Sequence, residues 1–232
     1  MSKTQLKLTF IALCLTFFNC KKETAEFTNY KYANEDSSFL CENLDSKLYL
    51  EALLSFEDDI TTYYDFNGRD LRRSYSFYTR DALGNKAKYQ DILTPHTMEV
   101  FEALKKDKDL WLNNSINYNS DLFTCLGDNF RIPSLQTTFK ALVSTNSMRP
   151  ELFGAPLLKH VKNAHEDRYI ATYVAFDLFY AKIFDIDPTT ITNDSQKTKA
   201  SRASNLLNNK AQTIQESAVE TEEKDPHAGH NH

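Results

Sequence analysis

The sequence is poor in glycine, with 5 glycines among 232 residues. Phosphate and cofactor loops need glycine where the backbone approaches a ligand closely. The chain has neither a glycine-rich phosphate loop nor a Gly-x-Ser-x-Gly turn. Scarce glycine and the lack of alternating apolar runs also leave little room for a sheet. These absences argue against the common nucleotide-dependent enzymes and serine hydrolases. They do not exclude enzymes that lack a local motif.

Basic residues are not in surplus either. The chain has 27 Lys and Arg against 32 Asp and Glu, which gives a formal charge of −5. A general nucleic-acid binder would need a basic face, so we expect no nucleic-acid partner. The cysteines and histidines also lack the spacing of a structural zinc site.

Long apolar runs are missing as well. The apolar stretch from Leu8 to Phe18 is shorter than the roughly 20 residues that a membrane-spanning helix needs. It follows Lys3 and Lys7 and gives way to Cys20. A basic region before an apolar region of this length is typical of a secretory signal.

This N-terminal pattern resembles the export signals of bacterial lipoproteins, over about the first 22 residues. In that family the chain is cut before a cysteine that then carries the lipid. The resemblance implies a signal peptide over residues 1–19, a lipidated Cys20 bearing a fatty acid such as palmitate, and a linker over 20–36. The family prefers a small residue before the cysteine and an aliphatic residue three before it, whereas this chain has Asn19 and Phe17.

The family's sorting pattern concerns the residue after the cysteine, where aspartate retains a lipoprotein in the inner membrane. Lys21 stands there in this chain, which implies the outer membrane. The expectation is therefore a cell-envelope protein attached to a membrane through its lipid. An ordinary signal peptide cut elsewhere, with Cys20 incidental, and an uncleaved anchor are the two alternatives.

Two cysteines remain once Cys14 leaves with the signal and Cys20 is lipidated. Cys41 and Cys125 form an even pair in an exported chain, and an oxidising compartment allows a disulfide between them. The alternative is two separate buried thiols.

Aromatic residues divide the rest of the chain, because none follows Phe184. We predict a helical domain over residues 37–188 and a polar tail over 189–232, since a segment without large apolar side chains buries little surface. Ala203, Leu207, Ala211 and Ile214 recur at helical spacing, which predicts a weak helix over 195–222.

Helical periodicity runs through the whole domain, so the fold class is all-α, an irregular array of about six to eight helices. Thr94-Pro95 marks a helix start, and Asn163 with Glu166 forms a capping pattern. Gly84 and Gly127 are expected to end helices. The predicted helices cover a stretch of about 20 residues around 49–63, then 69–83, 95–104, 120–126, 134–143, 150–160 and 169–184.

Asp177 is the sharpest candidate site residue, because its neighbours at helical spacing are apolar or tyrosine. A buried carboxylate must be paired, hydrogen-bonded or neutralised. It is either a ligand-binding or acid–base group, or a structural group paired with a tyrosine hydroxyl or an arginine.

Arg69, Arg73 and Arg80 share a predicted helix face that could hold a phosphate or carboxylate. The alternative is solvated ion pairs with acids of the preceding helix, at Glu57, Asp58 and Asp59.

The last residues contain His227, His230 and His232, a spacing that lets a flexible tail wrap a copper or zinc ion. The alternative is a solvated terminus without a metal. We expect no other cofactor.

Taken together, these residues favour a lipid-anchored envelope protein whose helical domain binds an envelope protein partner or a ligand without catalysis. Two other functions stay open: metal handling through the histidine tail, and a hydrolase that uses Asp177 with a nearby histidine.

Overall fold

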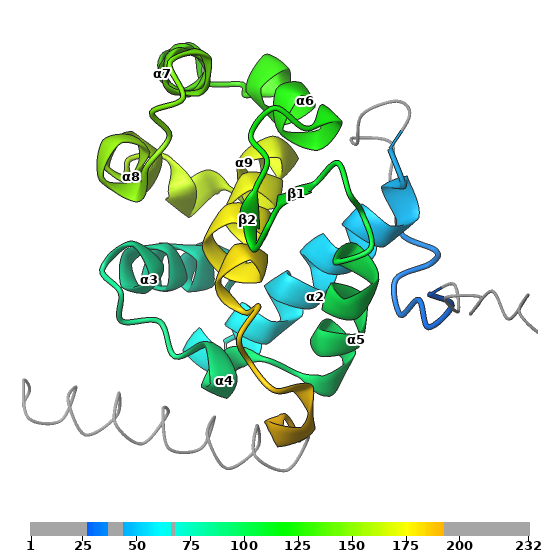
Figure 1. The fold of residues 1–232 in the computed structure, drawn as a ribbon. Coiled ribbons are helices and arrows are strands. Elements are labelled where there is room, and N and C mark those ends of the chain that lie inside the picture. The colour runs from blue at the N-terminus through cyan, green and yellow to red at the C-terminus, as the bar shows by residue number, and fades with distance from the viewer. Residues whose placement is uncertain (1–26, 37–43, 66–67, 193–232) are drawn as a thin grey trace, which may run out of the picture.

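The structure is a computed structural model and describes residues 27–36, 44–65 and 68–192. In these ranges the chain forms eight α-helices, a few short 3-10 and π turns, and a hairpin of two very short strands (Figure 1). The all-α prediction is confirmed. The α-helices are α2 (Ser46–Tyr64), α3 (Leu71–Leu83), α4 (Tyr89–Ile92), α5 (Pro95–Leu104), α6 (Asp121–Asn129), α7 (Pro133–Ser144), α8 (Pro150–Leu158) and α9 (Arg168–Tyr173).

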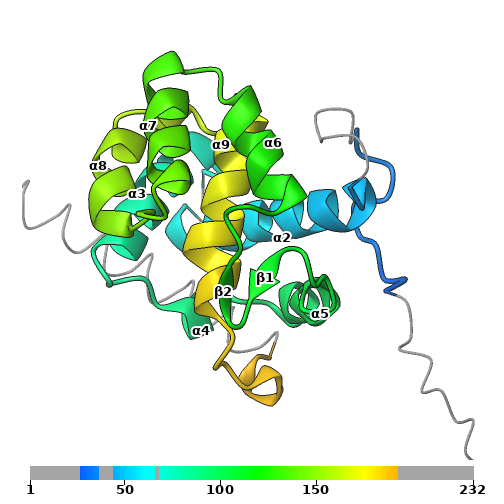
Figure 2. The ribbon, with the colours of Figure 1, turned by 45° about the horizontal axis from the view of Figure 1, so that its top comes forward.

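Helix α2 is the longest helix among the described residues, with 19 residues. Its start is capped by the Asp45 carboxylate, which accepts a hydrogen bond from the Leu48 amide. The predicted apolar stripe is buried, because Leu53, Phe56 and Ile60 have no exposed surface. This stripe packs α2 against α3 and α5, as two views of the ribbon show (Figures 1 and 2).

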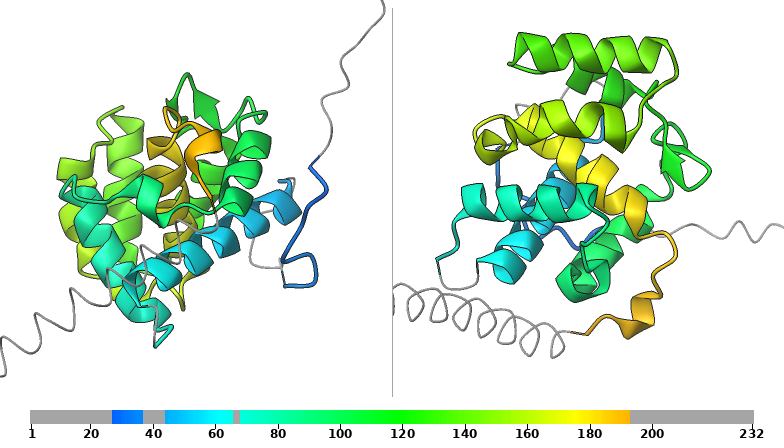
Figure 3. Two further views of the ribbon diagram at one scale, coloured as in Figure 1. Left: turned by 90° about the horizontal axis from the view of Figure 1, so that it is seen from below. Right: turned by 90° about the vertical axis from the view of Figure 1, so that its left-hand side faces the viewer.

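The most apolar segment runs through the middle of the molecule and departs from the prediction of one helix over 169–184. Helix α9 gives way to a π-helical segment, η3 (Val174–Phe179), and then to a 3-10 turn, η4 (Tyr180–Lys182). The N-cap of α9 is Asp167, whose carboxylate accepts hydrogen bonds from the Tyr169 and Ile170 amides. The prediction that Asn163 and Glu166 cap this helix is therefore wrong. Helices α7 and α8 lie on one side of this segment and α5 on the other (Figure 3).

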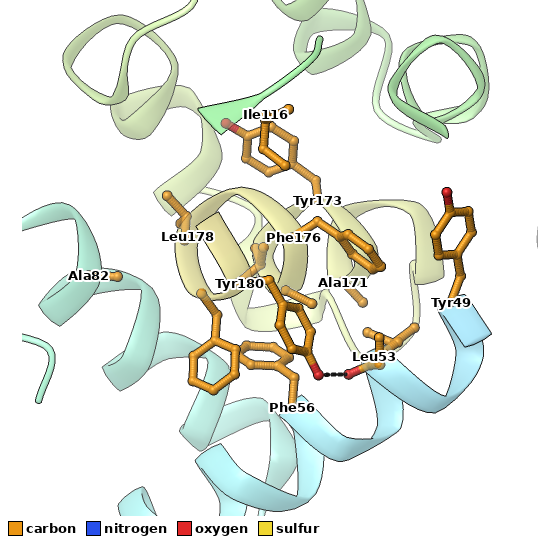
Figure 4. Packing of buried hydrophobic residues seen from close by; sticks show 14 of the residues in the cluster. Tyr49, Leu53, Phe56, Ala82, Ile116, Ala171, Tyr173, Phe176, Leu178 and Tyr180 are labelled. Atoms are coloured by element: carbon orange, nitrogen blue, oxygen red, sulfur yellow. Dashed lines mark hydrogen bonds between the residues drawn. The ribbon is translucent and has the colours of Figure 1, made fainter. Parts of the chain in front are cut away.

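Aromatic rings fill the space between α2 and the central segment. Phe56 of α2 lies 5.1 Å from Phe179, between ring centroids, and 5.0 Å from Tyr78 of α3. The Tyr180 hydroxyl is fully buried and donates to the Ala52 carbonyl of α2 (Figure 4). This bond satisfies a buried polar group that would otherwise destabilise the core by about 1–3 kcal/mol.

Two predicted helix boundaries are wrong for local reasons. Helix α3 begins at Leu71 rather than Arg69, because Arg69 has a φ of 51° and Asp70 caps the helix. Helix α6 continues past Gly127 to Asn129. A Cβ on Gly127 would lie 2.7 Å from Cε1 of Phe139 in α7, so this glycine allows close helix packing instead of ending the helix.

Residues at both ends of the described part of the chain also pack on the helices. Residues 27–36, expected as a linker, hydrogen-bond to α2 and α5. At the other end Ile191 is buried, after a 3-10 turn, η5 (Pro188–Thr190). The hairpin of β1 (Trp111–Leu112) and β2 (Ser115–Ile116) was not predicted, because two residues are too few for a strand pattern. The predicted helix over 195–222 lies outside the described residues.

The Gly127 packing generates a stability prediction. In Gly127→Ala, alanine gains about 1 kcal/mol of helix propensity, but overpacking a buried ring destabilises by about 1–3 kcal/mol. Phe139 is itself buried against Phe130, Phe153 and Tyr173, so its ring has little room to move. We expect a net loss in the free energy of unfolding, measured by urea denaturation.

The matched control is Thr124→Ala at an exposed position of the same helix, which should change stability by less than about 0.5 kcal/mol. A Gly127→Ala protein as stable as the wild type would contradict the packing argument.

Candidate functional site

Asp177 lies inside the π-helical segment and is 4% exposed. The Tyr118 hydroxyl donates to its Oδ1 at 2.6 Å, and the Tyr173 hydroxyl donates to its Oδ2 at 2.7 Å. Both carboxylate oxygens therefore have a tyrosine partner. Of the two roles that the sequence leaves open, this geometry corresponds to pairing with tyrosine hydroxyls.

The electrostatics of Asp177 follow from its surroundings. Burial raises the pKa of the carboxyl group, and the two tyrosine hydrogen bonds and the charge of Lys182 only partly oppose this rise. Burial and the nearby carboxylate also raise the pKa of both tyrosines. Asp177 is thus a buried, internally hydrogen-bonded carboxyl group rather than a carboxylate presented to solvent.

The π-helical segment also leaves a carbonyl that needs a donor. The Tyr78 hydroxyl donates to the Leu178 carbonyl at 2.6 Å, and the Tyr89 hydroxyl donates to it at 3.1 Å. Such segments are rare and are frequent at functional sites. Here four tyrosine hydroxyls donate to the Leu178 carbonyl and the Asp177 carboxylate.

A second buried acid, Glu51 of α2, joins three parts of the chain. Its carboxylate is 1% exposed and accepts hydrogen bonds from the Lys31 amide at 2.7 Å and the Tyr32 amide at 2.9 Å. His96 Nε2 of α5 lies 2.6 Å from the same carboxylate. Glu51 therefore fixes residues 27–36 against α2 and α5.

Asp59 lies two turns further along α2 and is also 1% exposed. Its partners are the Thr94 amide at 3.3 Å and the hydroxyls of Thr94 and Thr97 at the start of α5. Burial raises the pKa of Asp59 to about 8, and the hydrogen bonds from Thr94 and Thr97 only partly oppose this rise. Most Asp59 side chains are therefore neutral at pH 7.

The two acids before Asp59 have different partners again. Glu57 is buried and accepts from the Tyr75 hydroxyl at 2.8 Å and from the Arg168 guanidinium at 2.7 Å. Asp58 is partly exposed and binds Lys31 at 2.9 Å and Arg69 at 2.7 Å. The predicted set of surface acids facing the arginines thus reduces to Asp58.

The three candidate arginines are all exposed, but they do not form one helix face. Arg69 precedes α3 and is paired with Asp58. Arg73 and Arg80 belong to α3, and both guanidinium groups lie over the ring of Phe77, at 5.3 Å and 4.9 Å from its centroid. The structure therefore brings Arg73 and Arg80 together around a residue that the sequence analysis did not single out.

Several predicted site residues lie outside the described residues: Cys20, Cys41, His227, His230 and His232. Cys125 is disulfide-bonded, and no other cysteine is present in the described ranges. The Cys41–Cys125 pairing stays a prediction. In the same ranges, no group of three or more His, Cys, Asp or Glu side chains is placed to hold a metal ion.

Comparison with known proteins gives no relative from which a function could be inferred. No protein-family model matches the chain, and neither the curated proteins nor the solved structures give a significant match. Among the described residues, no helix has both the length and the apolar character that crossing a bilayer requires.

Glu51, His96 and Phe77 were not predicted as site residues. Glu51 follows Tyr49 by two residues, which turns it about 200° around α2 and away from the apolar stripe, so the helical pattern gave no signal for it. His96 and Phe77 carried no signal either, because their partners are set by the packing of α5 and by side-chain conformations on α3.

The pKa values of Asp59 and Asp58 generate opposite pH behaviour. A raised pKa in the folded protein means that the stability contribution of Asp59 is present near pH 4 and is lost as the pH rises towards 8. Asn resembles the protonated acid, so the unfolding free energy of the wild type should fall relative to Asp59→Asn between pH 5 and 7. The expected slope is about 1.4 kcal/mol per pH unit, measured by urea denaturation.

Asp58→Asn is the control for this measurement. Burial acts to raise the pKa of Asp58, but the hydrogen bonds and charges of Lys31 and Arg69 outweigh it and lower the pKa. Its contribution is lost only at acidic pH, so the difference between wild type and Asp58→Asn should be constant from pH 5 to 7. Equal slopes for both variants would refute the assignment.

Glu51 generates a prediction about residues 27–36. Glu51→Gln keeps the size of the side chain but replaces a carboxylate oxygen by an NH2 group that cannot accept from the Lys31 or Tyr32 amide. Since hydrogen bonds to charged groups contribute about 1.5–3 kcal/mol, the amide that loses its acceptor should exchange at least about tenfold faster with deuterium, measured by NMR.

Glu102→Gln provides the control, because Glu102 lies on exposed α5 surface and pairs only with Lys105 among the described residues. Unchanged exchange at Lys31 and Tyr32 in a folded Glu51→Gln protein would show that Glu51 does not hold this segment.

Proposed function

We propose that the protein is a lipid-anchored protein of the cell envelope, placed in the outer membrane, whose helical domain binds a protein partner or ligand without catalysis. The observation that carries the proposal is the use of the buried carboxylates. Glu51, Glu57 and Asp177 each have two or more internal donors. The groups best suited to acid–base chemistry are thus engaged in holding the fold, which favours a function on the surface.

The attachment of residues 27–36 supports the anchoring half of the proposal. Phe27 follows Cys20 by only seven positions, a distance of at most about 25 Å for an extended chain. Because Glu51 holds the following residues on α2 and α5, a lipid on Cys20 keeps the domain next to the membrane surface.

The anchoring is tested by labelling cells that express the protein with a radioactive or clickable fatty acid. The wild type should incorporate the label and partition into detergent, whereas Cys20→Ser should lose both properties, because the thiol is the acceptor of the lipid.

Cys14→Ser is the matched control, since Cys14 lies within the segment expected to be removed, and this variant should stay labelled. A Cys20→Ser protein that is acylated as strongly as the wild type would reject the anchoring. Affinity capture of the labelled wild type from its native envelope then identifies the partner.

A further inference from the structure

One surface group takes no part in the hydrogen bonds of the buried carboxylates: Arg73, Phe77 and Arg80 of α3. Arg73 precedes Phe77 by one helical turn and Arg80 follows it by nearly one turn. Both guanidinium groups lie over the same aromatic ring. Their side chains are 50% and 63% exposed. Stacking on an aromatic ring orders a guanidinium while leaving its N–H groups directed outward.

The acids nearest to these arginines form only long ion pairs with them. Arg73 lies 3.9 Å from Asp65, and Arg80 lies 3.7 Å from Asp81. Both separations exceed hydrogen-bonding distance, and no described residue accepts a shorter bond from either guanidinium.

The two carboxylates also have other donors. Asp65 accepts from the Asp70 amide at 2.9 Å, and Asp81 accepts from the Tyr64 hydroxyl at 3.2 Å. Arg69 differs, because it makes a short bond of 2.7 Å to Asp58. Arg73 and Arg80 therefore both keep hydrogen-bonding capacity for a ligand.

The ring beneath them is held in place from α2. Tyr64 stacks on Phe77 with an interplanar angle of 18° and a centroid distance of 6.5 Å. Tyr64 in turn packs against Tyr63 and the buried Tyr78. Phe77 is thus a half-buried ring supported by the core. This arrangement limits the side-chain entropy that the arginines would lose on binding.

We propose that Arg73, Phe77 and Arg80 form a docking platform for an extended acidic segment of a partner protein. The proposal rests on the proposed function, because it names the surface and the chemistry through which the domain binds its partner. Each guanidinium can hold one carboxylate with two parallel N–H···O bonds. In an extended peptide, side chains two residues apart lie on one face about 7 Å from each other. The distance between the two guanidinium groups cannot exceed the sum of their distances to the Phe77 ring centroid. A separation of about 7 Å, as between two such peptide side chains, fits within this limit.

Charge complementarity selects this occupant. The protein as a whole has a formal charge of −5, so an acidic partner is repelled by most of the surface and attracted at the arginines. Aromatic residues and arginine are also the residue types enriched at the centres of protein interfaces.

The probe for the test is a fluorescein-labelled peptide of alternating glutamate and serine, titrated with the detergent-solubilised full-length protein by fluorescence anisotropy. A peptide of alternating glutamine and serine gives the charge control. The wild type should bind the glutamate peptide only, and added salt should weaken binding. Arg73→Gln combined with Arg80→Gln should bind it about tenfold more weakly.

Two further variants separate the platform from general charge. Arg149→Gln combined with Lys159→Gln removes the same number of charges from exposed positions around α8 and should leave binding unchanged. Phe77→Leu keeps all charges but removes the ring, and should weaken binding severalfold while circular dichroism shows an intact helical domain.

The proposal is overturned if the arginine double variant binds like the wild type, or if the control double variant loses as much affinity. It is also overturned if a short single-stranded oligonucleotide binds equally well through the same arginines, or if the arginines instead mediate self-association in sedimentation experiments. None of these measurements depends on Cys20. Failure of the anchoring and failure of the platform are therefore distinguishable.

Discussion

Helix α2 carries three acidic side chains into the interior, and a carboxyl group is stable there only with hydrogen-bond partners around it. Each neighbouring part of the fold supplies some of these partners. Residues 27–36 and α5 supply them to Glu51, the start of α5 to Asp59, and α3 with α9 to Glu57. The apolar stripe of α2 brings these elements together, and its acids restrict how they align. Both faces of one helix thus determine the arrangement of the domain.

The same requirement explains the tyrosines around the central segment. Asp177 and the Leu178 carbonyl are adjacent polar groups in an apolar environment, and four tyrosine hydroxyls satisfy them. Tyrosine suits this task because its ring adds to the apolar core and its hydroxyl reaches a buried acceptor. The abundance of tyrosine in the chain is accounted for in part by this internal role.

The sequence was sufficient for the fold class and for most helices, because their apolar residues recur at helical spacing and local caps such as Thr94-Pro95 mark their starts. It was insufficient where tertiary packing overrides local pattern. Gly127 looks like a helix end but lies within α6 because Phe139 needs the space, and the run after Tyr169 looks like one α-helix but becomes π-helical. The burial of Asp177 and its pairing with a tyrosine hydroxyl were among the predicted alternatives, and Tyr173 lies one helical turn away, whereas the second partner was not predictable. Tyr118 lies 59 residues away along the chain, and no local pattern encodes that contact.

The π-helical segment η3 gives this part of the core an unusual dependence on chain length. A π turn contains one residue more than the corresponding α-helical ring, so a deletion within Val174–Phe179 would let the segment close as an ordinary α-helix. Later side chains would then keep roughly their present orientation, because the lost residue is the extra one that the wider turn accommodates. In a regular α-helix such as α2, the same deletion would rotate every later side chain by about 100° about the helix axis. Tyr180, which reaches the Ala52 carbonyl, and Ile183, which is buried in the core, therefore follow a segment where the loss of one residue disturbs the packing less than it would in α2.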